Sequence, residues 1–301
     1  MSIETIGILS PGEMGQAIGA VLHQHQMRVI THLRGRSTRT IARAYAAGFI
    51  EVPDDETLVR EADVLLSILP PDQAPALAER IATALRTTGA TLLFVDCNAI
   101  APRTVRTLEQ QLTEVGATFV DVGIIGGPPR PGEPGPRLYA SGPRAAEVAQ
   151  LRAAGLDIRV LGLQSGQASG LKMCYASLTK GLTALATEAL VAGRVIGVQE
   201  ALTSELQELP LFQMISRAVP GMPPKAYRWV GEMQEIAQTF ADLGLPPQMP
   251  EGAASLYRFI EGTILGAEIS EHRQHGQTLE EVVAILATAL AEQSAQDQTD
   301  S

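Results

Sequence analysis

The sequence predicts an α/β domain with a doubly wound, mostly parallel sheet, followed by an all-α C-terminal domain. Two observations lead to this prediction. Short β-branched runs alternate with helical patterns over residues 1–163, and the strand signal disappears after Gly166. Alternating strands and helices joined by short loops are typical of a parallel sheet that is covered on both faces. A chain of 301 residues is also long enough for two domains, each with its own core.

Seven segments are expected to form the strands, because β-branched and other apolar residues gather in them. They are residues 3–9, 28–33, 64–68, 91–95, 118–121, 138–141 and 158–161. The first helix follows the first strand, since its apolar residues recur at i, i+4, i+7 and i+8. These residues are Met14, Ile18, Val21 and Leu22.

Five helices are expected in the second domain, with Gly or Pro at most of the breaks between them. They cover residues 167–198, 204–218, 223–243, 250–265 and 278–292. The domain boundary is placed in the segment 162–166. The predicted domains are therefore 1–163 and 164–295, and a polar, disordered tail is expected at 296–301.

The charge of the chain limits its partners. The formal net charge is −10 at pH 7, whereas nucleic-acid backbones and anionic membranes both require a basic face. No apolar run reaches the roughly 20 residues that span a bilayer. We therefore expect no nucleic-acid or membrane partner. An anionic small-molecule substrate would have to be bound by a few local basic residues.

The cysteines and histidines do not suggest a metal site. Cys97 and Cys174 match no metal-binding or CxxC spacing, which favours a reduced, cytoplasmic protein. No basic leader precedes the apolar sequence that begins at Ile3. His272 and His275 form an HxxH pair, but no third ligand stands nearby, so a surface role is favoured.

The segment after the first strand resembles a dinucleotide-binding loop. In the usual GxGxxG pattern, the backbone approaches the pyrophosphate and a helix N-terminus points at it. Here Ser10 takes the place of the first glycine, while Gly12 and Gly15 occupy the second and third. Its place between a strand and an amphipathic helix makes this degenerate pattern specific. A Rossmann domain is therefore expected, with a dinucleotide contacted by Ser10, Pro11, Gly12, Glu13 and Met14.

The choice of cofactor is read at the end of the second strand, where an NAD enzyme would place an acid. This chain has no acid there but carries Arg34, Arg36 and Ser37. Guanidinium groups and hydroxyls suit a 2′-phosphate. The alternative is a solvated basic loop. We expect NADP(H) as the cofactor.

Six short blocks occur in an order that resembles the β-hydroxyacid dehydrogenase superfamily. This superfamily includes 3-hydroxyisobutyrate, tartronate semialdehyde and 6-phosphogluconate dehydrogenases. The blocks lie at residues 7–15, 35–37, 68–71, 96–98, 121–127 and 166–172. The segment 225–233 is similar to one in a less characterised subgroup. The resemblance implies a homodimer, which the long apolar helix 167–198 also suggests.

The resemblance also implies roles for single residues. Leu69 and Pro70 match the loop that packs on the adenosine side and the nicotinamide ribose. Asn98 stands where the family has a small polar residue beside the substrate and the nicotinamide. Lys172 matches the lysine that handles the proton of the reacting hydroxyl.

Gly126 and Gly127 match the paired glycines whose amides hold the substrate carboxylate, although Ile125 replaces the serine before the pair. Tyr175 and Ala176 replace the His-Asn pair of the 6-phosphogluconate enzymes. This departure argues against 6-phosphogluconate as the substrate and against decarboxylation.

The residues of the long helix agree with this assignment. Lys172, Tyr175 and Thr179 share one face at i, i+3 and i+7, with Lys180 beside them. Desolvation can lower the pKa of a lysine enough for acid–base work. The chain has 23 basic residues but only three lysines, which suggests that Lys172 does what arginine cannot. The alternative is an ordinary solvent face.

We therefore expect a catalytic set of Lys172, Tyr175 and Asn98. Lys180 and Arg228 are expected to bind the substrate, although Arg228 shares its helical face with two glutamates and could equally belong to a charged exterior.

Three functions remain open at this point. The first is an NADPH-linked dehydrogenase or reductase of a small hydroxy or keto acid. The second is an imine reductase, which the retained Lys172 disfavours. The third is a non-catalytic NADP-binding sensor, since a fold does not fix a function, but such a chain would have no need for Lys172.

Overall fold

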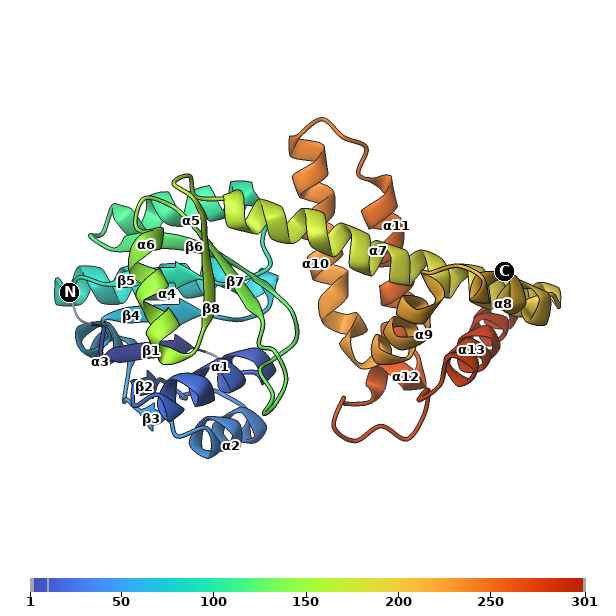
Figure 1. The fold of residues 1–301 in the computed structure, drawn as a ribbon, viewed down its shortest axis with the longest axis horizontal. Coiled ribbons are helices and arrows are strands. Elements are labelled where there is room, and N and C mark those ends of the chain that lie inside the picture. The colour runs from blue at the N-terminus through green and yellow to red at the C-terminus, as the bar shows by residue number, and fades with distance from the viewer. Residues whose placement is uncertain (1–2, 10, 300–301) are drawn as a thin grey trace. The chain divides into compact units, whose positions relative to one another are not determined.

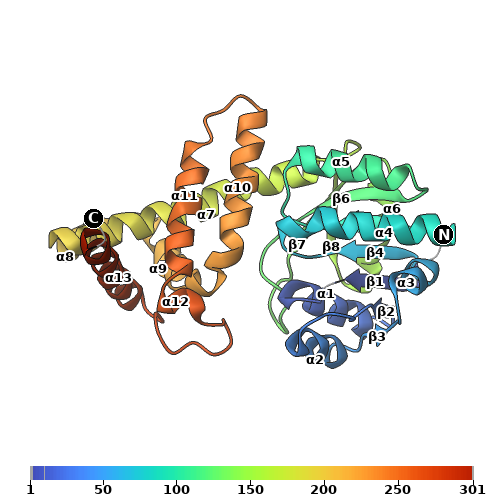
Figure 2. The same ribbon diagram turned by 180° about the vertical axis from the view of Figure 1, so that it is seen from behind.

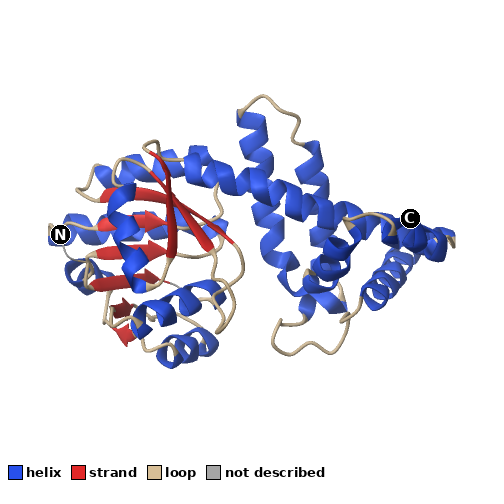
Figure 3. Cartoon of the chain, in the orientation of Figure 1, coloured by secondary structure: helices blue, strands red, loops and turns tan. Residues whose placement is uncertain are grey.

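The computed structural model describes residues 3–9 and 11–299, with no side-chain detail beyond residue 296 (Figure 1). It divides into two compact units between Met173 and Cys174. All described strands lie in the first unit, and the second consists of helices and their connections (Figure 3). The predicted fold class is confirmed. The units divide beyond the expected boundary after residue 163, because the start of α7 (Gln167–Ile196) belongs to the first unit.

The first unit is built on one eight-stranded sheet with the order β3-β2-β1-β4-β5-β6-β7-β8. All neighbouring strands are parallel except β6 and β7. The strands are β1 (Thr5–Leu9), β2 (Arg28–Thr31), β3 (Ile50–Glu51), β4 (Val64–Ser67), β5 (Leu93–Asp96), β6 (Thr118–Ile125), β7 (Arg137–Ser141) and β8 (Asp157–Gly162). The seven expected strands all form, while the two residues of β3 are too few to give a sequence pattern.

Helices cover both faces of this sheet (Figure 2). They are α1 (Glu13–Gln24), α2 (Thr38–Ala46), α3 (Asp55–Glu61), α4 (Ala74–Thr88), α5 (Pro102–Thr113) and α6 (Ala145–Val148), with 3₁₀ turns at Pro71–Gln73 and Ala149–Ala154. The side chains of a strand alternate between its faces. In β4, Val64 and Leu66 accordingly join a core with Ile18 of α1, while Leu65 joins a separate core with Leu58 of α3.

The second unit contains most of α7 together with α8 (Gln199–Gln207), α9 (Phe212–Gly221), α10 (Ala226–Asp242), α11 (Gln248–Glu261), α12 (Ile264–Ala267) and α13 (Leu279–Thr299), and a 3₁₀ turn at Pro223–Lys225. The helix expected at 204–218 is interrupted between α8 and α9. Pro210 stands at this break, and proline has no amide to continue a helical hydrogen-bond ladder. α13 continues to Thr299, so residues 296–299 are helical rather than disordered as expected.

The core of the second unit lies around the pair formed by α10 and α11, which run side by side (Figure 1). Met233 and Ile236 of α10 are buried, as are Tyr257 and Ile260 of α11. Within residues 3–9 and 11–299, no helix is both long and apolar enough to cross a membrane.

Candidate functional site

The expected site residues of the first unit gather at one edge of the sheet. β1, β4, β5 and β6 run parallel, and their register aligns Ser67 with Asp96 and Asp96 with Asp121. The carboxyl ends of these strands therefore meet at the same edge. In open α/β sheets this edge is where ligands bind.

The dinucleotide loop connects β1 to α1 at this edge. α1 begins at Glu13, directly after Gly12, and no side-chain hydrogen bond caps this helix end among the described residues. Gly15 and Ile18 are buried on the sheet, while Gly12 and Met14 are only partly buried. The first-turn amides and the positive end of the helix dipole therefore fit a pyrophosphate. Ser10 lies outside the described residues.

The loop after β2 forms a tight turn. The amide of Arg36 donates to the Leu33 carbonyl at 3.0 Å, and Gly35 has a φ of +77°, which favours glycine. Ser37 caps α2 by accepting a hydrogen bond from the amide of Thr40 at 3.2 Å. Arg34 is exposed and Arg36 is half-buried. Burial, followed by the neighbouring Arg80, lowers the pKa of the Arg36 guanidinium, and Asp55 opposes this shift.

Two buried polar side-chain atoms at the end of β2 lack a hydrogen-bond partner among the residues that the structure describes. Thr31 Oγ1 and His32 Nε2 are buried and have no hydrogen-bond partner in the described part of the chain. Such atoms are costly unless a partner satisfies them. The ribose of a dinucleotide carries hydroxyl groups that could serve as such partners.

The structure also brings an acid to this place, which sequence reasoning missed. Asp55, at the start of α3, accepts a hydrogen bond from His32 Nδ1 at 2.9 Å, and it forms an ion pair of 2.7 Å with Arg80 of α4. Asp55 follows β2 by more than twenty residues, so no local sequence pattern predicts its contact with His32.

The Asn98 side chain links the carboxyl ends of β4 and β5 by hydrogen bonds. Its side chain accepts a hydrogen bond from the Leu69 amide at 2.8 Å, and it donates to Ser67 Oγ at 2.8 Å and to Asp96 Oδ2 at 2.7 Å. It is 2% exposed. Asn98 was expected to be catalytic, but these internal bonds favour a positioning role. They fix the loop that carries Leu69 and Pro70.

The two buried residues before Asn98, Asp96 and Cys97, have raised pKa values. Burial raises the pKa of Asp96 to about 7, although the hydrogen bonds from Asn98 oppose the shift. Burial also raises the pKa of the Cys97 thiol, and nearby Lys172 opposes that change. Cys97 is thus a protonated thiol at neutral pH.

Asp121 of β6 caps the start of α7. Its carboxylate accepts hydrogen bonds from the amides of Gly166 at 2.9 Å and Ser169 at 3.0 Å, and from the hydroxyls of Ser169 at 2.5 Å and Ser141 at 2.9 Å. Ser141 Oγ in turn accepts from the Ala168 amide at 2.9 Å. These bonds satisfy amides at the helix N-terminus that have no partner within the helix. Burial nevertheless raises the pKa of Asp121.

A glycine in β6 lets α7 approach the sheet. A Cβ atom at Gly123 would lie 2.5 Å from the carbonyl oxygen of Ala168 and 3.3 Å from the Cβ of Lys172. Only glycine fits this contact without a shift of the helix. The ammonium group of Lys172 then donates a hydrogen bond to the Ile124 carbonyl at 2.5 Å. The proposed catalytic lysine is thereby held at the carboxyl end of β6.

The paired glycines, Gly126 and Gly127, directly follow the end of β6. Gly126 has a φ of +127°, and a Cβ atom there would lie 3.0 Å from Cα of Pro136. A Cβ atom at Gly127 would meet no heavy atom within 4 Å. Gly126 therefore shapes the turn, and the space beside Gly127 is open.

The other expected site residues belong to the second unit. The side chains of Lys180 and Glu232 are 12% and 13% exposed and form an ion pair. The ammonium group of Lys180 lies 5.0 Å from the centre of the Trp229 ring. Burial lowers the pKa of Lys180, Glu232 raises it, and Arg228 lowers it further. The structure thus brings Lys180 and Arg228 together, with Glu232 as the counter-ion of Lys180. Tyr175 is 45% exposed.

The described residues contain no group of three or more His, Cys, Asp or Glu side chains arranged to hold a metal ion. In the HxxH pair, Nδ1 of His275 lies 2.6 Å from a carboxylate oxygen of Glu268.

Comparison with known proteins gives matches in both parts of the chain. Residues 5–154 match the NAD binding domain of 6-phosphogluconate dehydrogenase, and residues 194–260 match a domain of unknown function, DUF1932. An uncharacterized 28.5 kDa protein of Methanothermus fervidus is 26% identical over 85% of this chain and 98% of the relative.

Solved structures extend the likeness to the whole fold. The conserved protein MTH1747, described as structurally similar to 3-hydroxyacid dehydrogenases, is 30% identical over 85% of this chain and 96% of its own, with a TM-score of 0.65. The 3-hydroxyisobutyrate dehydrogenase of Salmonella typhimurium shares the fold at 15% identity, with a TM-score of 0.68 over 94% of this chain and 99% of its own.

These matches indicate a 3-hydroxyacid dehydrogenase-like oxidoreductase with a nicotinamide cofactor and a small-molecule substrate. Three features are consistent with this conclusion. They are the order of the strands, the loop before α1, and Lys172 of α7, which is bonded to the Ile124 carbonyl of β6. The chain belongs to the β-hydroxyacid dehydrogenase superfamily.

Proposed function

We propose that this protein is an NADP(H)-dependent oxidoreductase that interconverts a small hydroxy acid and the corresponding keto acid, with Lys172 as the general acid–base group. The observation that supports this most directly is the position of Lys172. It is held by the Ile124 carbonyl at the ligand-binding edge of the sheet, two residues before the paired glycines. When bound, the nicotinamide supplies or accepts the hydride.

The cofactor would be held by residues of the first unit. The N-terminus of α1 would bind the pyrophosphate, with contacts from Pro11, Gly12, Glu13 and Met14. Ser10 completes this loop in the sequence. Leu69 and Pro70 would pack against the cofactor from the end of β4, where the Asn98 side chain holds the Leu69 amide.

Selection of the phosphorylated cofactor is assigned to the loop after β2. Arg36 is half-buried and Arg34 is exposed, so the 2′-phosphate would meet one partly desolvated guanidinium group and one solvated group. Ser37 contributes at the start of α2, where anions bind favourably.

The protein's own chemistry is a proton transfer. During reduction, the ammonium group of Lys172 donates a proton to the carbonyl oxygen of the substrate, and during oxidation the neutral amine accepts the proton of the hydroxyl. General acid–base groups of this kind accelerate a reaction roughly 10²- to 10⁴-fold. Tyr175, one helical turn further along α7, is the reserve candidate for this proton.

The substrate carboxylate is assigned to Gly126 and Gly127, since the space beside Gly127 is open. Lys180 and Arg228 are proposed as further anion-binding groups.

We also propose a homodimer. Leu178 and Leu185 of α7 are 65% and 58% exposed, and they lie on the same helical face at i and i+7. A second copy would remove this apolar surface from water.

The test is a turnover assay that follows NADPH consumption with a panel of small keto acids and, separately, a panel of cyclic imines. Turnover of keto acids and the reverse reaction with hydroxy acids and NADP⁺ are expected. Reduction of imines alone would replace the proposal by an imine reductase. Tight NADPH binding with no turnover of either panel would favour the sensor.

A further inference from the structure

We infer that Asp55 is an acid masked by Arg80, and that Arg80 thereby determines whether the corner at the end of β2 accepts a phosphorylated dinucleotide. The inference rests on the proposed function and deepens its cofactor site. It assigns a specificity-determining role to a residue of α4, a helix whose sequence gave no functional signal.

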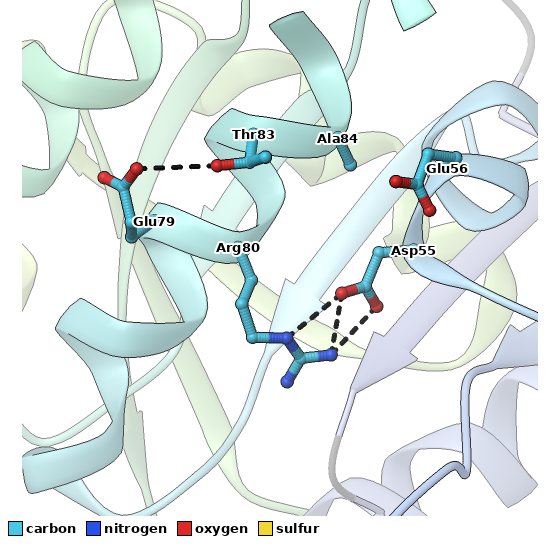
Figure 4. A pocket seen from close by; sticks show the side chains of 6 residues that line it. All are labelled: Asp55, Glu56, Glu79, Arg80, Thr83 and Ala84. Carbon is cyan, nitrogen blue, oxygen red and sulfur yellow. Dashed lines mark hydrogen bonds and ion pairs between the residues drawn. The ribbon is translucent and has the colours of Figure 1, made fainter. Parts of the chain in front are cut away.

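The contact between the two side chains is extensive (Figure 4). Arg80 donates from Nε to Asp55 Oδ2 at 3.1 Å, and from Nη2 to Oδ1 at 3.0 Å and to Oδ2 at 2.7 Å. The Asp55 side chain is 15% exposed. Bidentate arginine–carboxylate pairs are among the strongest in proteins. The two residues line a shallow pocket together with Glu56, Glu79 and Thr83.

The pair lies beside the loop assigned to the 2′-phosphate. Asp55 Oδ1 is 2.9 Å from Nδ1 of His32, the residue that directly follows β2. Arg36 is within electrostatic range of both partners, since Arg80 lowers the pKa of its guanidinium and Asp55 raises it. Asp55 therefore lies at the end of β2, where an NAD enzyme carries an acid that binds the ribose hydroxyls.

Without its ion pair to Arg80, the Asp55 carboxylate would disfavour the binding of a phosphate at the end of β2. It would repel the phosphate directly, and it would compete with it for Arg36. With Arg80 bound, the charges of Asp55 and Arg80 cancel, and the positive charge of Arg36 is left for the ligand. Both Asp55 oxygens are already occupied by Arg80, with His32 adding a contact to Oδ1, so the acid is not available to ribose hydroxyls either.

The experiment measures dissociation constants for NADPH and NADH by fluorescence titration. Arg80→Met is expected to weaken NADPH binding roughly 10- to 100-fold and to change NADH binding less than about 3-fold, as removing one partner of a charge pair leaves the other uncompensated. Asp55→Asn combined with Arg80→Met is expected to return NADPH affinity to within about 3-fold of wild type, because no carboxylate is left to mask. Thermal unfolding of each variant checks that it folds.

Arg86→Met is the matched control. Arg86 lies on the same helix, pairs with Glu79 and is 51% exposed, so its loss should leave both affinities unchanged. If Arg80→Met keeps the wild-type preference for NADPH, the inference is wrong while the proposed cofactor stands. If the double variant binds NADPH as weakly as Arg80→Met, Arg80 contacts the phosphate itself and the masking role is overturned. Equal affinities of the wild-type protein for the two dinucleotides would overturn the proposed cofactor, and the inference with it.

Discussion

The ammonium group of Lys172 donates a hydrogen bond to the main-chain carbonyl of Ile124 at 2.5 Å. Ile124 lies two residues before Gly126, so the bond ties the lysine to the strand that leads into the paired glycines. Asp121 of the same strand caps the helix that carries Lys172. The acid–base group and the proposed carboxylate site are thus positioned by one strand, β6.

Replacing Lys172 tests its role in proton transfer. Lys172→Met is expected to lower turnover roughly 10²- to 10⁴-fold while leaving NADPH affinity within about 3-fold of wild type, because the proposed cofactor residues lie elsewhere in the first unit. Lys172→Arg should fail almost as badly, since a guanidinium group keeps its proton. Steady-state rates and NADPH titrations measure both effects.

Lys225→Met removes a lysine from the 3₁₀ turn Pro223–Lys225 and serves as the control, with turnover expected to stay near normal. Near-normal rates in Lys172→Arg would reduce Lys172 to an electrostatic anchor. Tyr175 would then become the candidate for the proton.

Arg36 is expected to contribute selectively to NADPH binding. Arg36→Ala should weaken NADPH roughly 10- to 30-fold and NADH by less than about 3-fold, a cost at the lower end for a charge pair because the side chain is only half-buried. Arg28→Ala is the control, since Arg28 stands at the opposite end of β2 and pairs with Glu61. An equal loss of affinity for the two dinucleotides in Arg36→Ala would contradict the assignment to the 2′-phosphate.

The fold could be predicted because its signals are local. Each predicted strand is a short apolar run, and alternation of strands with helices is enough to indicate a parallel sheet. Several features of the site depend instead on partners far along the chain. Asp121 was expected as the end of a strand and the start of a family-like block, but its contacts with Ser141, Gly166 and Ser169, which lie 20, 45 and 48 residues away, were not predicted.

The same limit explains the other differences. The catalytic role of Asn98 stays a prediction, but sequence could not show that Ser67, Leu69 and Asp96 would occupy its hydrogen bonds. Asp55 was missed because it reaches the end of β2 from a different helix. The catalytic role of Lys172 stays a prediction, whereas the polar network at the ends of β4, β5 and β6 could not be predicted from the sequence.

The packing of α7 on β6 should be sensitive to one methyl group. Gly123→Ala would place Cβ 2.5 Å from the Ala168 carbonyl oxygen, so the helix must shift, at a cost of about 1–3 kcal/mol in the free energy of unfolding. Because Lys172 moves with the helix, turnover should fall by more than the loss of folded protein explains. Urea unfolding and rates per folded molecule measure the two effects.

Gly135→Ala is the matched control, because a Cβ atom there would meet no heavy atom within 4 Å and its φ is not positive. Its stability should change by less than about 0.5 kcal/mol. A Gly123→Ala protein with wild-type stability and turnover would show that the helix is free to adjust, and that the close contact does not position Lys172.

The proposed dimer should depend on the apolar face of α7. Leu185→Glu would place a charge on a side chain that is 58% exposed in the single chain, so it should be tolerated by the fold but not by a buried interface. Light scattering at micromolar concentration is expected to give a dimer for the wild-type protein and a monomer for the variant. Glu188→Gln, at an exposed polar position of the same helix, should remain dimeric. A monomeric wild-type protein would contradict the proposal.

Stability should depend on pH through Asp96. Burial raises its pKa to about 7, whereas an unfolded chain gives about 4. Between these values the folded protein binds more protons at this site than the unfolded chain does. The stabilisation is therefore fully present below a pH of about 4 and is lost as the pH rises through about 7, at no more than about 1.4 kcal/mol per pH unit.

Asp96→Asn removes this titration while leaving Asp121, whose pKa is also raised by burial, in both proteins. The difference between the two free energies of unfolding therefore reports the titration of Asp96 together with its electrostatic coupling to Asp121. Measured by urea unfolding from pH of about 5 to about 8, the wild-type protein should lose stability relative to the variant up to about pH 7, and the two curves should run parallel above it. Curves that are parallel over the whole range would show that Asp96 is already ionised at pH 5, with the hydrogen bonds from Asn98 outweighing its burial.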